Sequence, residues 1–333
     1  MFIDAHLDLA YNAVRGRDVT LPASQQAADE QGTPTVGLPD LRQGGAMLIC
    51  ATLFAEPASH HTPEGYRTAD EARAQAWRQV DWYRRQCDAG RLRLVRSAAE
   101  LPQSRDNGPL PALLLMEGAD ALESDAGVHA FCEAGVRIVG LAWHRTRLAG
   151  GTGEPGGLTA DGRAIVSAMD RLHMIHDTSH LAEEAFWELL DLSGGPVIAS
   201  HSNCRAIVPG DRQLSDRMIR AILNRGGVVG INFFDGLLVP PAQLARRRPD
   251  LHDVVRHVSH VCDLAGDALH VGIGSDLDGG FGRERLPNGI TTAAEIPRLA
   301  EHLSDAGFGD DDVHRIMWGN WLEYFRRTLR PGP

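Results

Sequence analysis

Lysine is absent from this sequence of 333 residues, in which all 33 basic residues are arginine. A chain without lysine can form no Schiff base through lysine and has no lysine to hold a phosphate in a phosphate-binding loop. It also lacks the carboxylated lysine that bridges two metal ions in some enzymes. Any group that bridges two metals in this protein must therefore be a different side chain.

The features that mark secreted, membrane-bound or nucleic-acid-binding proteins are also missing. A net charge of -11 and an isoelectric point of about 5.7 disfavour nucleic acids and anionic membranes as partners. No basic segment followed by an apolar one opens the chain, and no apolar run reaches the ~18 residues of a membrane span. The five cysteines form no C-x-x-C pair and cannot all pair internally. We therefore expect an unprocessed cytoplasmic protein.

Short apolar runs alternate along the chain with segments of helical periodicity. Strands that alternate with helices form parallel sheets, and near-continuous Val, Ile and Leu are typical of strands covered on both faces. We count eight runs, at residues 1–9, 46–54, 112–117, 137–143, 173–178, 196–200, 227–234 and 270–275. The sequence therefore predicts an α/β fold, a single (β/α)8 TIM barrel domain over residues 1–333.

Helices are expected between and after these strands, at residues 67–89, 160–172, 182–193, 215–225, 250–265 and 310–328. Thr159, Ser215 and Asp310 stand where N-caps are expected. Residues 16–44 are rich in Pro, Gly, Gln and Asp, so we expect them to cross the barrel rim rather than to link two domains.

Five of the apolar runs end in residues of the types that bind metal ions. Active sites of such barrels lie at the carboxyl ends of the strands. The first run gives His6 and Asp8, which the two-residue period of a strand places on one face. Asp4 shares that face at greater depth, and we expect it to form structural hydrogen bonds. Glu117 ends the third run, where burial of a carboxylate without a cation is unfavourable in free energy. It is therefore our candidate for the residue that bridges two metal ions.

The fifth and sixth runs are followed by His180 and His201, which supply imidazoles from adjacent strands. Imidazole and carboxylate together form the usual ligand set of zinc and similar ions. Asp276, after the eighth run, could move a proton from metal-bound water to a leaving amine. A metal lowers the pKa of its water from about 15.7 to about 7, so attack on a carbonyl becomes possible at neutral pH.

Each of these residues alone also has a structural interpretation, because a strand-end aspartate can cap a helix and a histidine can fill a core or loop. Their coincidence at five strand ends favours a metal site. Eight other histidines lie in loops or helical patterns and are expected at the surface: His60, His61, His129, His252, His257, His260, His270 and His314.

The order of these motifs resembles that of the membrane (renal) dipeptidase family of the amidohydrolase superfamily. The motifs are His6-x-Asp8, Glu117, His180 in Asp-x-Ser-His, His201 in Ser-His-Ser, and Ser275-Asp276-x-Asp278-Gly279. Residues 157–159, 196–202 and 319–322 extend the resemblance over nearly the whole chain. It implies a distorted (β/α)8 barrel with two divalent metal ions, zinc favoured, that hydrolyses dipeptides through metal-bound hydroxide, including those with a carboxyl-terminal D-residue.

By position, the resemblance implies that one metal is bound by His6 and Asp8 and the other by His180 and His201, with Glu117 as the bridge. His144 corresponds to a histidine that contacts the substrate or the tetrahedral intermediate, and Asp276 to a catalytic aspartate. Arg212 corresponds to an arginine that receives the carboxylate of the substrate, a task suited to a guanidinium. A plain surface role of Arg212 stays open, because arginine is common in this chain.

Two departures and two alternatives remain. Some family members carry a tyrosine after the Asn-Phe of strand seven, whereas this chain reads Asn232-Phe233-Phe234, which leaves recognition of the carboxyl end open. The secreted, lipid-anchored members are poorer comparisons than bacterial ones, and family analogy implies a homodimer. The substrate could instead be another small amide, such as an N-acyl-amino acid or a β-lactam. A barrel that has lost activity and acts as a binding protein is disfavoured by its complete set of site residues.

Overall fold

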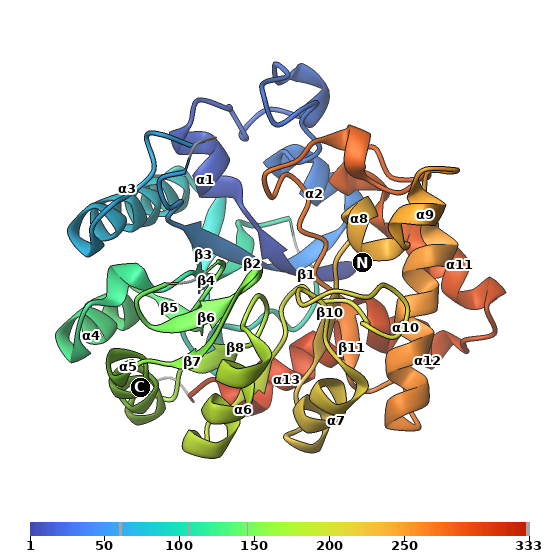
Figure 1. Ribbon diagram of the computed structural model, residues 1–333. Coiled ribbons are helices and arrows are strands. Elements are labelled where there is room, and N and C mark those ends of the chain that lie inside the picture. Colours follow the sequence, from blue (N-terminus) through green and yellow to red (C-terminus); the bar gives the residue numbers. More distant parts are fainter. Residues whose placement is uncertain (60–61, 106, 145, 331–333) are drawn as a thin grey trace.

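A parallel β-sheet closes into a barrel at the centre of the computed structural model, which describes residues 1–59, 62–105, 107–144 and 146–330 (Figure 1). Neighbouring strands of the described residues follow the order β10-β11-β1-β2-β4-β5-β8-β9. The ring closes between β9 and β10, where Ala199 pairs with Val229 and the backbone N–H of Gly230 donates to Ala199 O at 2.8 Å. The predicted (β/α)8 barrel is confirmed.

Each of the eight predicted strand segments overlaps one strand of the barrel. The strands are β1 (Phe2–Leu7), β2 (Ala46–Phe54), β4 (Leu110–Glu117), β5 (Val136–Gly140), β8 (Ile175–Asp177), β9 (Val197–Ile198), β10 (Val229–Ile231) and β11 (Val271–Ile273). Two features were not predicted from the sequence. They are β3 (Leu92–Leu94), which pairs with β4, and the antiparallel hairpin of β6 (Ala149–Gly151) and β7 (Glu154–Leu158).

Helices surround the barrel in the ribbon view (Figure 1). The predicted helical segments correspond to α3 (Ala69–Asp88), α5 (Ala160–Arg171), α6 (Glu183–Leu192), α7 (Asp216–Asn224), α10 (Leu251–Ala265), and α12 (Asp310–His314) with α13 (Asn320–Thr328), joined by a π-helical turn (Arg315–Gly319). Helices that were not predicted are α1 (Leu9–Val14), α2 (Leu38–Gly44), α4 (Asp125–Ala134), α8 (Asp235–Leu238), α9 (Pro241–Leu244) and α11 (Leu299–Asp305). The segment 16–44 therefore contains a helix, α2.

Two of the three predicted N-caps are confirmed. The hydroxyl of Thr159 accepts from Gly162 N, and that of Ser215 accepts from Met218 N. The prediction for Asp310 is wrong, because Gly309 has the extended backbone of an N-cap and Asp310 is already helical.

Among the histidines expected at the surface, His60 and His61 lie outside the described residues. His257 contradicts the expectation, because it is fully buried. It lies on the face of α10 that packs toward the barrel. A helical pattern shows that a residue lies in a helix, but a polar side chain on the inner face is not distinguished from one on the outer face unless its partner is known.

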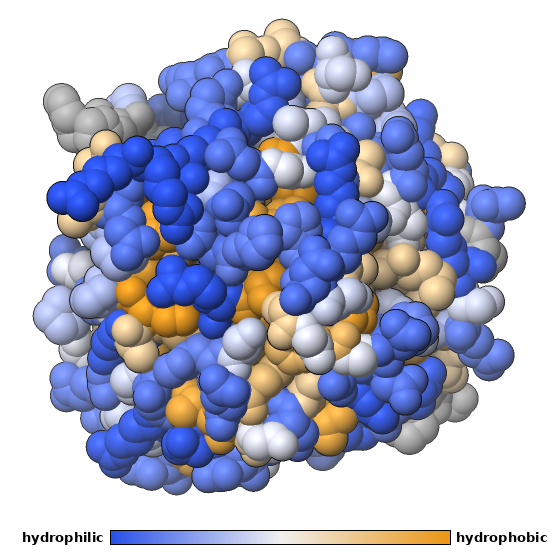
Figure 2. Space-filling view, turned by 90° about the vertical axis from the view of Figure 1, so that its right-hand side faces the viewer, coloured by the Kyte–Doolittle hydropathy of each residue, from blue (hydrophilic) through white to orange (hydrophobic). Residues whose placement is uncertain are grey.

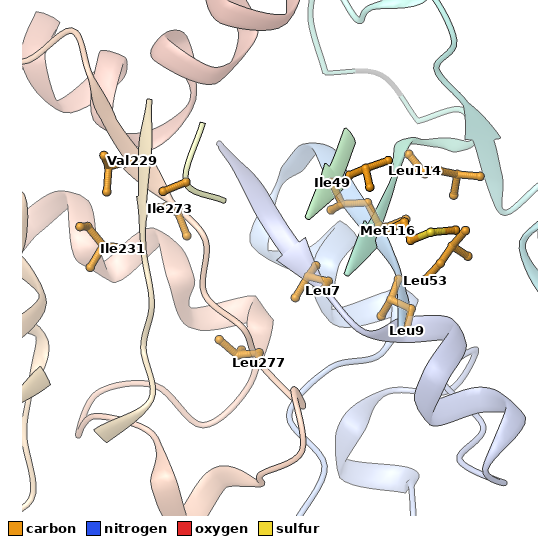
Figure 3. Close-up of a cluster of buried hydrophobic side chains, with 14 of the residues drawn as sticks. Leu7, Leu9, Ile49, Leu53, Leu114, Met116, Val229, Ile231, Ile273 and Leu277 are labelled. Carbon is orange, nitrogen blue, oxygen red and sulfur yellow. The ribbon is translucent and has the colours of Figure 1, made fainter. Parts of the chain in front are cut away.

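Alternate residues of β2 and β4 pack in two separate regions. Leu48 and Leu113 point into the barrel, where residues from the other strands meet them. The neighbouring Ile49, Leu53, Leu114 and Met116 point outward and pack beneath the surrounding helices (Figure 3). Because side chains of a strand alternate between faces, the inward series of β4 ends in its last residue, Glu117.

The amino-terminal end of the barrel is covered by α13. The indole N–H of Trp321 donates to Ile273 O at 3.0 Å, and the hydroxyl of Tyr324 donates to Val197 O at 3.0 Å. Asn320 donates to Ala268 O and Val271 O. This helix therefore closes one end of the barrel and leaves the carboxyl ends of the strands for the site.

Hydrophilic side chains predominate on the side of the molecule that carries α9 to α12, with apolar residues in the hollows between them (Figure 2). Within the described ranges, no helix has both the length and the apolar character that crossing a bilayer requires.

Candidate metal centre

A cavity of about 420 Å³ opens at the carboxyl ends of the barrel strands. Residues that end or follow each of the eight barrel strands line it, namely Asp8, Phe54, Glu56, Glu117, Trp143, His144, His180, His201, Asn232, Phe234 and Asp276. Parallel strands of a barrel all end at the same rim, so segments far apart in the sequence meet there.

The first group of ligand-type side chains consists of His6, Asp8 and Glu117, all buried. His6 Nε2 lies 3.7 Å from Asp8 Oδ2 and 3.6 Å from Glu117 Oε2. The structure therefore brings together the histidine and carboxylate of the first strand, as expected, with the carboxylate that ends β4.

The second group consists of Glu117, His180 and His201. Glu117 Oε1 lies 3.3 Å from His180 Nε2 and 3.2 Å from His201 Nε2, and the two ring nitrogens lie 3.0 Å apart. His180 has a φ of 65°, the left-handed region, which turns its side chain toward the centre. Glu117 thus faces His6 with one oxygen and the two other histidines with the second.

Asp276 lies beside both groups. Its Oδ1 is 3.9 Å from His6 Nε2, and it forms a third ligand-type group with His6 and His201. Its Oδ2 accepts a hydrogen bond from Asn232 Nδ2 at 2.9 Å. The backbone at Asp276 is left-handed, with a φ of 61°, and a non-glycine residue adopts this region only where the surroundings enforce it.

The outer ring nitrogens of the histidines are held by protein oxygens. His201 Nδ1 lies 2.7 Å from the Ser200 hydroxyl, whose own hydrogen is donated to Asp177 Oδ2. The hydroxyl therefore accepts from His201 Nδ1, which leaves Nε2 with a lone pair toward the centre. His180 Nδ1 lies 3.0 Å from the hydroxyl of Thr152.

Three buried atoms of this cluster, among the described residues, have no hydrogen-bond partner. They are His6 Nε2, Asp8 Oδ1 and Glu117 Oε1. Buried polar atoms are normally satisfied, so a convergence of unpaired nitrogen and carboxylate acceptors indicates a cation site. Imidazole and carboxylate are also the chemical types that zinc and related divalent ions bind. The residues present therefore fit a divalent metal.

Burial and charge perturb the titration of these groups. Burial, with the nearby carboxylates of Asp8 and Glu117, raises the pKa of Asp276 to about 8, against the opposing effect of His6. Burial opposes the charged form of His6, but the carboxylates of Glu117 and Asp8 hold its pKa well above the ordinary value. Carboxylates packed this closely repel one another, and a cation between them relieves the repulsion.

His144 and Arg212 lie on the cavity wall. His144 Nδ1 donates to the carbonyl oxygen of Thr152 at 2.6 Å. Arg212 is partly buried and donates to Ser202 Oγ at 2.8 Å and to His201 O at 2.7 Å. These bonds fix the guanidinium beside the cluster, so Arg212 is not a plain surface residue.

Asp4 has the structural role expected of it. Its Oδ1 accepts from the backbone N–H groups of Ser275 and His6, at 2.9 and 3.2 Å, and its Oδ2 accepts from the Ser275 hydroxyl. These bonds join β1 to the segment after β11 and so fix the relative positions of His6 and Asp276.

Sequence reasoning missed several residues of the site. Thr152 lies in the β6–β7 hairpin, and Asn232 follows β10; neither is a common metal ligand, so neither was marked as a candidate. Glu56, just beyond β2, lines the cavity and accepts from the Thr62 hydroxyl at 2.7 Å. A carboxylate two residues past a strand end was a signal that could have identified Glu56. Arg285 also lines the cavity and lies over the ring of Phe234.

A parallel barrel with histidines and carboxylates converging at its carboxyl rim belongs to the class of (β/α)8 metal-dependent hydrolases. Comparison with known proteins defines the family. The family model described as membrane dipeptidase, peptidase family M19, matches residues 1–330, and the chain belongs to this family.

Individual relatives agree with this assignment. An uncharacterized protein in the pqqA 5' region of Klebsiella pneumoniae is 34% identical over 250 residues, which cover 72% of this chain and 90% of that protein. Dipeptidase tcpJ of Claviceps purpurea is 29% identical, over 88% of this chain and 69% of that protein. A metallopeptidase from Rhodobacter sphaeroides, liganded with a phosphinate mimic of the dipeptide L-Ala-D-Ala, superposes with a TM-score of 0.84 and 27% identity, over 98% of this chain and 99% of that chain.

Proposed function

We propose that this protein is a binuclear, zinc-dependent dipeptidase. The observation that carries the proposal is the convergence of five ligand-type side chains around atoms that have no other partner, on the wall of a cavity that also presents Arg212. Peptidase family membership supports hydrolysis of a peptide bond, and the cavity of about 420 Å³ suits a small substrate.

The geometry of Glu117 supports two ions rather than one. Its Oε2 faces His6, whereas its Oε1 faces His180 and His201. We assign one ion to His6 and Asp8 and the other to His180 and His201, with Glu117 bridging them. Bound divalent ions would supply an activated water and a Lewis acid for the scissile carbonyl, the chemistry that amide hydrolysis needs.

Asp276 is the proposed general base and acid. Its carboxyl group lies beside the ligand groups, with Oδ1 3.9 Å from His6 Nε2, and a carboxylate placed there can both take and return a proton. It takes a proton from the attacking water as the new C–O bond forms. It then donates that proton to the amine nitrogen as the C–N bond breaks.

His144 and Arg212 are proposed to hold the substrate. A carbonyl oxygen can only accept, so the Nδ1 of His144 carries hydrogen for its bond to Thr152, and Nε2 can donate to an oxyanion only in the imidazolium form. Arg212 keeps donors beyond those used by Ser202 and His201, and a guanidinium suits a substrate carboxylate. The dipeptide carboxyl end would then lie on the β9 side of the cavity.

The proposal is tested by metal removal and a substrate panel. Enzyme treated with EDTA and verified metal-free should not cleave dipeptides, and added zinc should restore cleavage. Equal rates without metal would refute the proposed mechanism. The panel pairs L,L with L,D dipeptides and includes N-acyl-amino acids and a β-lactam. The ligand of the Rhodobacter sphaeroides relative, a mimic of L-Ala-D-Ala, supports acceptance of a carboxyl-terminal D-residue.

We also propose that the protein is a cytoplasmic homodimer. The dimer rests on analogy within the family, and the location rests on five cysteines that contain no C-x-x-C pair and cannot all pair internally. Light scattering measures the mass in solution, and a monomer mass would contradict the dimer. Cell fractionation tests the location.

A further inference from the structure

Asn232 contacts the proposed proton-transfer group directly. It follows β10, lies on the cavity wall and is fully buried. Its Nδ2 donates to Asp276 Oδ2 at 2.9 Å, across the gap between the segments that follow β10 and β11. This bond is direct, and no ligand-type residue lies between the two side chains.

The direction of the Asn232 amide is fixed by its other bond. Its Oδ1 accepts from the backbone N–H of Phe234 at 2.7 Å. An N–H cannot accept, so the amide cannot turn over without losing this bond. The side chain therefore presents a donor to Asp276 and never an acceptor.

A network of buried amides fixes the position of Asn232 itself. The Asn232 backbone N–H donates to Asn203 Oδ1 at 2.8 Å, and Asn203 Nδ2 donates to Asn232 O at 3.0 Å. Asn203 N donates in turn to Gln213 Oε1 at 3.2 Å, and Gln213 follows Arg212 in the chain. Asn203 and Gln213 are both buried, and fully satisfied buried networks are rigid.

We propose that Asn232 is a positioning residue for Asp276. The amide of Asn232 donates a hydrogen bond to Oδ2 of Asp276 and thereby fixes the orientation of the carboxyl group. Oδ1 of Asp276 is then the oxygen that carries the proton. Oδ1 is the oxygen that faces the centre, 3.9 Å from His6 Nε2. A carboxylate free to rotate would spend part of its time with neither oxygen aligned, and misplacement of a reacting group is costly in rate. This inference rests on the proposed dipeptidase function.

A double-mutant cycle tests the inference with the full-length zinc-loaded protein. Asn232→Ala should lower kcat by about 10- to 100-fold, the usual cost of one hydrogen bond to a charged group, with little change in KM or zinc content. In the Asp276→Ala background the same change should cost less than about threefold, because its effect passes through Asp276. An equal loss in both backgrounds, or loss of zinc, would show a merely structural role and overturn the inference.

A second variant and a readout without catalysis keep the two proposals separate. Asn232→Leu replaces the amide with an apolar group of similar size, which guards against collapse of the site. Crystal structures of zinc-loaded wild type and this variant should show Asp276 in one orientation in the former and turned or multiply oriented in the latter. If the orientation of the Asp276 side chain is the same in the variant as in wild type, the inference is refuted, whether or not the wild type cleaves dipeptides. If wild type is inactive while Asp276 responds as expected, the proposed function fails and the positioning role stands.

Discussion

At the scale of single residues, the histidines of the centre are oriented by hydroxyl groups that contact their outer ring nitrogens. Ser200 stands between Asp177 and the ring of His201, and Thr152 stands behind His180. The ligand types themselves were predictable from the sequence, because each ends or follows an apolar run. The residues that contact these ligand types were not predictable from the sequence. Serine, threonine and asparagine are common in loops, and their contacts become visible only when the strands are placed side by side.

Replacement of Asp276 tests its chemical role. Asp276→Asn keeps the shape of the side chain but removes the basic oxygen, so turnover should fall by about 10²- to 10⁴-fold. Zinc content, measured by mass spectrometry, should stay at the wild-type value. If zinc and activity were lost together, Asp276 would be a ligand rather than a proton carrier, a role that its proximity to His6 and His201 also permits.

Replacement of Arg212 tests recognition of the substrate carboxylate. Arg212→Met should raise KM for dipeptides by about 10- to 100-fold, the range for one charge-assisted hydrogen bond, and should change kcat less. The effect should be much smaller for the corresponding dipeptide amides, which lack the carboxylate. Arg84→Met, an exposed arginine on α3 that does not line the cavity, is the matched control. A similar increase in KM for amides and free acids would refute the assignment.

At the scale of elements, a strand or helix could be predicted only where its side chains form a clear apolar run or a helical period. The eight strand segments were found because apolar runs are required wherever both faces of a strand are buried. The β6–β7 hairpin was missed because its sequence, Ala149 to Leu158, contains five glycines and no alternating apolar series. Short helices such as α1 and α2 were missed because two turns provide too few positions for a helical period. One of the missed elements, this hairpin, carries Thr152, whose hydroxyl lies 3.0 Å from His180 Nδ1.

The hairpin should control metal affinity through Thr152. Thr152→Val removes the hydroxyl that lies 3.0 Å from His180 Nδ1. Loss of a group that orients a metal ligand typically weakens metal binding by about 10- to 100-fold. Titration against a chromophoric chelator measures this affinity, and Thr152→Ser, which retains the hydroxyl, should behave as wild type. Unchanged affinity in the valine variant would show that the hairpin does not orient His180.

Helix α10 joins two rim segments through His257, and this gives a pH dependence. Cys204 N donates to His257 Nδ1 at 3.2 Å, and His257 Nε2 donates to Leu238 O at 3.1 Å, so the ring is neutral. Burial lowers the pKa of His257 to about 4. Its stabilisation is therefore complete above its ordinary pKa of about 6.5 and is lost as pH falls toward 4.

The variant His257→Asn tests this dependence. An asparagine oxygen can still accept from Cys204 N, but the side chain does not titrate. Thermal midpoints measured between about pH 7 and pH 5 should fall less steeply for the variant than for wild type. Parallel slopes would show that His257 does not contribute to acid sensitivity.

At the scale of the whole molecule, the metal centre and the barrel should stabilise each other. The ligand-type residues come from β1, β4 and the segments after β1, β8 and β9, so bound ions would link opposite parts of the ring. Zinc at about 100 times its dissociation constant should stabilise the fold by about 2.7 kcal/mol per site. Calorimetry of zinc-loaded and EDTA-treated protein should show a higher midpoint with zinc, and Asp8→Asn should reduce the difference. Identical midpoints would contradict a structural link through the metals.

The pairing of β1 with β11 has a consequence for synthesis. β1 is made first, but one of its two neighbours, β11, and the covering helix α13 are made only after most of the chain has left the ribosome. Until then one edge of β1 has no partner, and the apolar interior of the incomplete ring is open. Exposed edges and late long-range pairing favour aggregation. The order of the strands in the sequence therefore sets how long an unpaired edge of β1 stays exposed while the chain is synthesised.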